Sequence, residues 1–216
     1  MPSLARILAL MLLAGTALLG IGAAVHPVLA GDAAAQLRVI AETSYWRSIH
    51  LVMLAGSALV AAGVWVRLMT DESGGLLAAL PGLALISLGV AINGLNIAYM
   101  AGAGWHMADL FQAGRLEVAA VFEATHPFGL IAARFGNLLV ALGALALGWV
   151  EWRARNTRWL AWLAWLAAAG GLVGVVFFDE SSRFALAAIA LLSGWQIAVA
   201  LQGLRSARNR AASDVA

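Results

Sequence analysis

The chain has no cysteine and no lysine, and charged residues fill only 11% of its 216 positions. Without cysteine it has no disulfides, thiolate metal sites, iron–sulfur clusters or covalently attached c-type haem. Soluble domains carry charge at about a quarter of their residues. With 63% hydrophobic residues and a mean hydropathy of +0.90, the composition excludes a soluble enzyme, a nucleic-acid-binding domain and a disordered tail. We therefore predict an integral membrane protein in a lipid bilayer.

The net charge of +2 comes from thirteen arginines against eleven acidic residues. Most of these arginines lie between apolar runs, where they are typical of membrane orientation signals rather than of a phosphate-binding face. No nucleic-acid partner is expected.

Six apolar stretches are long enough to cross the hydrocarbon as helices, which takes about 20 residues each. They give an all-α fold: one domain over 1–216 with six transmembrane helices and a terminal tail. The expected spans are 7–25, 48–66, 76–100, 128–150, 159–178 and 184–204, followed by a tail over 205–216. Glycines seven residues apart at Gly56 and Gly63, and again at Gly136 and Gly143, are typical of a helix-packing seam.

The arginine distribution predicts which way the bundle faces, because short cytoplasmic loops are enriched in positive charge. Eight arginines fall on the side of the termini and four on the other side. Both termini are therefore expected in the cytoplasm, in the inner membrane of a bacterium. The first span has 19 apolar residues, longer than the usual 7–15 of a signal peptide, so we expect it to be retained; cleavage after Ala30 is the alternative.

Two outer connections are amphipathic, 32–47 and 102–125. Each is expected to lie along the membrane interface, and together they could cover a pocket at the outer ends of the first four spans.

All four histidines fall on this outer side: His26, His50, His106 and His126. Met53 follows His50 by one helical turn. Imidazole suits zinc, copper and iron, and thioether suits haem iron or Cu(I). One interpretation is a haem b with two axial ligands, His50 with either His126 or His26, and with Met53 as a softer alternative.

Two carboxylate–histidine pairs lie at a spacing of three residues, His106 with Asp109 and Glu123 with His126. On helices each pair faces one way. These four residues form a second candidate set, which would hold a copper, iron or zinc ion. The alternative is that no cofactor is present and that the histidines only meet water, headgroups or helix ends.

Arg134 lies eight residues after His126, about 12 Å along a helix. A guanidinium at that depth is costly unless it is paired or hydrated, which marks a functional candidate. It could neutralise a haem propionate or a bound anion, or bond to neighbouring helix carbonyls.

The sequence carries none of the common nucleotide-binding or hydrolase motifs, and it does not decide whether the protein is an enzyme. The first functional hypothesis is electron transfer or redox chemistry with a lipid-soluble carrier. The alternative is an accessory or assembly subunit of a larger membrane complex, whose histidines are incidental. A small-molecule carrier is a third hypothesis.

Overall fold

The computed structural model describes residues 3–70, 76–154, 157–176 and 183–213, and within them it is helical without strands. Six of its helices are long and apolar enough to cross a membrane. The elements are α1 (Leu4–Val25), α2 (Ala33–Glu42), α3 (Trp46–Gly63), α4 (Val66–Thr70), α5 (Leu76–Tyr99), a π-helical turn (Met100–Gly104), α6 (Trp105–Gln112), α7 (Val118–Arg153), α8 (Arg158–Val176) and α9 (Arg183–Ser213). The prediction of six membrane-spanning helices is thereby confirmed, although α3 ends at Gly63 within the second predicted span and residues 177–178 of the fifth lie outside the described part of the chain. The chain is a multi-pass membrane protein.

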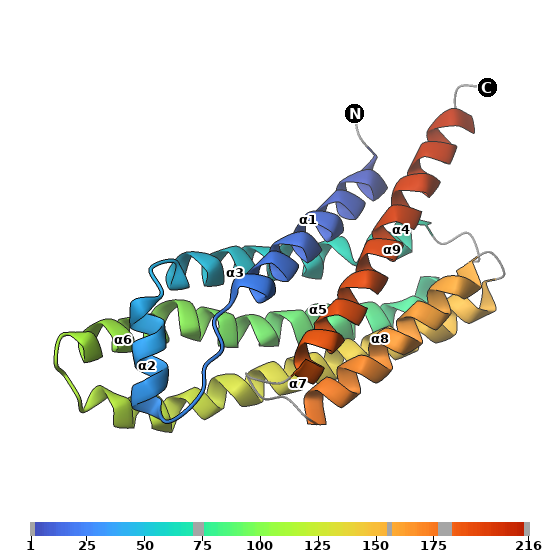
Figure 1. The fold of residues 1–216 in the computed structure, drawn as a ribbon. Helices are drawn as coiled ribbons and strands as arrows, with labels where there is room; N and C mark the ends of the chain where they lie inside the picture. Colours follow the sequence, from blue (N-terminus) through green and yellow to red (C-terminus); the bar gives the residue numbers. More distant parts are fainter. Residues whose placement is uncertain (1–2, 71–75, 155–156, 177–182, 214–216) are drawn as a thin grey trace.

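The six long helices pack as a closed ring in the order α1, α3, α5, α7, α8 and α9, with α9 returning to α1. The start of α1 and the end of α9 lie together at one end of this bundle, and α2 and α6 lie at the other (Figure 1). We call these the termini end and the histidine end, since the histidines follow α1, begin α3, or lie on α6 and near the start of α7.

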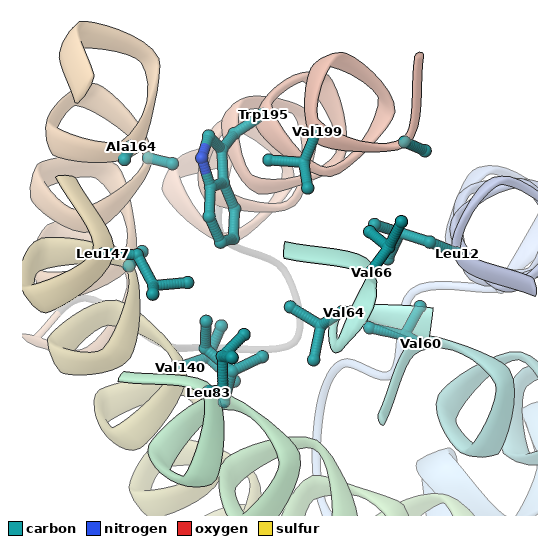
Figure 2. Packing of buried hydrophobic residues seen from close by; sticks show 14 of the residues in the cluster. Leu12, Val60, Val64, Val66, Leu83, Val140, Leu147, Ala164, Trp195 and Val199 are labelled. Atoms are coloured by element: carbon teal, nitrogen blue, oxygen red, sulfur yellow. The ribbon is translucent and has the colours of Figure 1, made fainter. Parts of the chain in front are cut away.

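Small and branched apolar side chains from every long helix fill the centre of the ring (Figure 2). Val60 and Leu83 face this core from α3 and α5, and Trp195 reaches it from α9. The centre is therefore packed with side chains rather than left as a pore.

Glycines bring neighbouring helices into backbone contact. A β-carbon added at Gly136 of α7 would lie 2.5 Å from the carbonyl oxygen of Gly89 in α5, and one at Gly15 of α1 would lie 2.7 Å from that of Gly56 in α3. Only glycine permits so close an approach. The seven-residue glycine spacing thus belongs to two antiparallel hairpins, α1 with α3 and α5 with α7.

The connection 102–125 is largely helical and continues the flanking spans, where the sequence predicted a separate amphipathic segment. The π-helical turn and α6 continue α5 as far as Gln112, and α7 already begins at Val118, so that Pro127 lies inside α7. Hydropathy alone hides this extension, because most of its polar residues are exposed while Val118 and Phe122 are buried in one cluster with Leu37 and Met107. The two helices form a hairpin beyond the apolar spans.

Gly114 makes the tight turn of this hairpin. Its φ of 91° lies in the left-handed region, which glycine adopts without steric cost. The amide of Gly114 donates to the carbonyl of Phe111, and the amide of Arg115 donates to that of Leu110. This pair of bonds is a Schellman motif, which ends α6.

The other outer connection forms α2, which crosses the end of the bundle (Figure 1). The side chain of Asp32 caps α2 by accepting from the amide of Ala35 at 2.8 Å. Leu37 and Ile40 are fully buried against residues of α6 and α7. α2 thus packs on α6 and α7 at this end of the bundle.

A buried ion pair joins α4 to α7 near the termini end. Nε of Arg67 donates to a carboxylate oxygen of Glu151, and the two residues are 6% and 2% exposed. Arg67 is one of the eight arginines that the charge distribution assigns to loops on the side of the termini, whereas in the structure it is buried in α4.

Candidate functional site at the histidine end

His26 and His50 meet at the histidine end. His26 caps the end of α1, and His50 lies in the second turn of α3. Their Nε2 atoms are 3.2 Å apart, and the rings meet edge to face with centroids 5.0 Å apart. His50 is only 2% exposed, whereas His26 is partly exposed. Two of the predicted ligands are therefore in direct contact.

The backbone of Trp46 fixes the protonation pattern of His50. Nδ1 of His50 lies 2.8 Å from the Trp46 carbonyl oxygen. A carbonyl only accepts, so Nδ1 must carry the proton and Nε2 of a neutral His50 must present a lone pair. That lone pair faces His26. The same arrangement, with one ring nitrogen bonded to a carbonyl, orients histidines that bind metals.

Trp46 itself is firmly anchored. It is fully buried, and its Nε1 donates to the carbonyl of Met100 at 3.0 Å. Met100 begins the π-helical turn, and its carbonyl also accepts from the amide of Trp105. The indole packs against both imidazoles, with ring centroids 4.9 Å from His26 and 4.5 Å from His50. Sequence reasoning missed this role, although the spacing of four residues between Trp46 and His50 was visible.

His126 takes different neighbours. It is buried on α7, with its ring stacked on Phe122 at 4.6 Å and parallel to Tyr99 at 6.4 Å between centroids. The Tyr99 hydroxyl shares a hydrogen bond of 2.8 Å with Thr125. Of the two partners considered for His50, the structure thus brings His26 into contact with it and places His126 in an aromatic stack.

The second candidate set does not gather. His106, Asp109 and Glu123 are exposed on α6 and α7, whereas His126 is buried. Among the described residues no three His, Asp or Glu side chains are grouped so that they could hold a metal ion. In the turn between these helices, Nε of Arg115 donates to Glu117 at 2.5 Å, and this bond lowers the pKa of that exposed carboxyl.

Arg134 lies on the exposed face of α7, between the exposed apolar side chains of Ile131 and Phe135. His26 and His50 lie on α1 and α3. The guanidinium therefore lies on the circumference of the helix ring, away from its packed centre, a placement that the sequence did not predict.

Comparison of the chain with protein-family models, with curated proteins and with solved structures finds no match. The functional argument therefore rests on the geometry of the histidine end.

Proposed function

We propose that the protein binds a transition-metal ion between His26 and His50 and serves electron transfer or redox chemistry in the inner membrane of a bacterium. The arginine distribution supports cytoplasmic termini, which would place the histidine end on the periplasmic side. The observation that carries the proposal is the contact of 3.2 Å between two Nε2 atoms.

This distance resembles that between two ligands of one ion. With bonds of about 2.0 Å, two imidazole nitrogens at a trigonal or tetrahedral metal lie about 3.3–3.5 Å apart. In the metal-free pair, His26 would donate from Nε2 to the lone pair of His50. Metal binding would need only a shift of the His26 proton to Nδ1 and a small rotation of its ring, because Trp46 already holds His50 in the ligating tautomer.

The same geometry favours a bare ion over haem b. Axial ligands approach haem iron from opposite faces, so their nitrogens lie about 4 Å apart with the macrocycle between them. The two rings here touch edge to face, with Trp46 packed against both. A haem held by this pair would have to separate the two rings, which are in contact at the end of α1 and the start of α3.

Removal of one imidazole tests the proposal. His50→Ala should weaken the binding of copper or zinc at least about tenfold, because one of two nitrogen ligands is lost. Isothermal titration of the detergent-purified protein with each metal measures this change. The matched control is His106→Ala, whose imidazole is exposed on α6 and should leave the affinity unchanged. Equal affinities for the wild type and His50→Ala would refute the site.

A further inference from the structure

We infer that the ion is copper, held as Cu(I) by His26, His50 and the thioether of Met53. This inference rests on the proposed metal site and adds its third ligand and the identity of its metal.

Met53 lies about one helical turn along α3 from His50. His50 and Met53 are three residues apart on α3 and share one helix face, and Gly22 of α1 lies four residues before the C-cap His26. The helices run antiparallel, with His26 in contact with His50 and Gly22 in contact with Met53. A β-carbon at Gly22 would lie 2.2 Å from Cγ of Met53 and 2.8 Å from its Sδ. The thioether thus lies about one helical turn from the imidazoles.

Gly22 is what makes room for this side chain. Any larger residue there would overlap Met53, whereas two residues earlier, at Gly20, a β-carbon would meet no atom within 4 Å. Methionine is unbranched, with a flexible side chain that can adjust its sulfur by rotation. Rotation about the side-chain bonds of Met53 would bring this sulfur toward an ion bound by the histidine pair.

The chemistry of the three ligand atoms indicates which metal ion the site would bind. Structural and catalytic zinc sites use at least three His, Cys, Asp or Glu ligands, and no such group of three occurs among the described residues. The chain also has no cysteine, so that thioether is its only soft sulfur donor. Two imidazoles with one thioether form a neutral, soft set of three, which selects Cu(I), an ion that accepts low coordination numbers.

The test compares Cu(I) with Zn(II) in the full-length protein. Cu(I) is supplied with ascorbate under anaerobic conditions, in competition with a chromophoric Cu(I) chelator, and Zn(II) is titrated separately. Met53→Leu keeps the bulk of the side chain and removes the sulfur, so we expect a loss of at least about tenfold in Cu(I) affinity and little change for Zn(II). The control is Met107→Leu, a buried methionine packed among α2, α6 and α7 residues.

A second variant pair displaces the sulfur without removing it. Gly22→Ala should lower Cu(I) affinity in the same direction as Met53→Leu, whereas Gly20→Ala should match the wild type. If Met53→Leu and Gly22→Ala bind Cu(I) as tightly as the wild type while His50→Ala does not, the thioether ligand is refuted and the two-histidine site stands. If the wild type binds neither metal, the proposed function fails and this inference fails with it.

Discussion

Replacement of Arg67 by leucine should lower the free energy of unfolding by about 3–5 kcal/mol. The reason is the carboxylate that remains: Glu151 is 2% exposed, and its Oε2 has no hydrogen-bond partner among the described residues. Without Arg67 the carboxylate would be buried with its main countercharge removed. Unfolding in mixed micelles of mild detergent and SDS, followed by circular dichroism, measures the change.

Two further variants isolate the cause. The double variant Arg67→Leu with Glu151→Leu should recover most of the loss, because replacing both members of a buried pair by apolar residues is often neutral. Arg115→Leu removes the exposed ion pair with Glu117 and should leave the unfolding curve unchanged. If Arg67→Leu unfolds like the wild type, the buried pair does not hold α4 on α7.

Adding a single methyl group at Gly136 should lower the free energy of unfolding by about 2–3 kcal/mol, the upper part of the range for overpacked cores. Its β-carbon would lie 2.5 Å from the carbonyl oxygen of Gly89 and 2.7 Å from the amide nitrogen of Asn93. Both are backbone atoms, so that relief requires α5 and α7 to move apart rather than a side chain to rotate. We expect Gly136→Ala to show this loss in the same unfolding assay.

Gly194→Ala is the matched control, since a β-carbon at that position of α9 meets nothing within 4 Å. It should keep or slightly raise stability, because alanine favours helix over glycine by up to about 1 kcal/mol. Equal stability of Gly136→Ala and Gly194→Ala would show that α5 and α7 do not approach at their glycines.

The spans were predictable because hydropathy reports burial in lipid directly. The structure extends most of them, and the largest differences are α5 continued through α6 and α7 begun at Val118. These extensions bury one face only, through residues such as Val118 and Phe122, and expose polar ones such as Glu123. A hydropathy window averages both faces and therefore ends the span too early.

The candidate site was predictable in its residue types but not in its contacts. His26, His50 and Met53 were all proposed as ligands, yet sequence did not choose His26 over His126 as the partner of His50. That choice depends on the register between α1 and α3, which is set by close contacts such as Gly15 with Gly56.

The burial of charge was the least predictable feature. Arg134 is exposed on α7, whereas Arg67 is buried against Glu151. The local sequence around each arginine is apolar, so the difference arises only from which face of the ring each one occupies. Helix packing, rather than the neighbouring residues, decides it.

The most direct test of the account is the metal content of the detergent-purified protein after loading with copper under reducing conditions, with its visible spectrum recorded on the same sample. We expect about one copper ion per chain, lost when His26 and His50 are both alanine, and no Soret band. A Soret band that shifts on reduction would show that the protein binds haem and would contradict the copper site. A wild-type protein that retains no copper and shows no such band would contradict the proposed site.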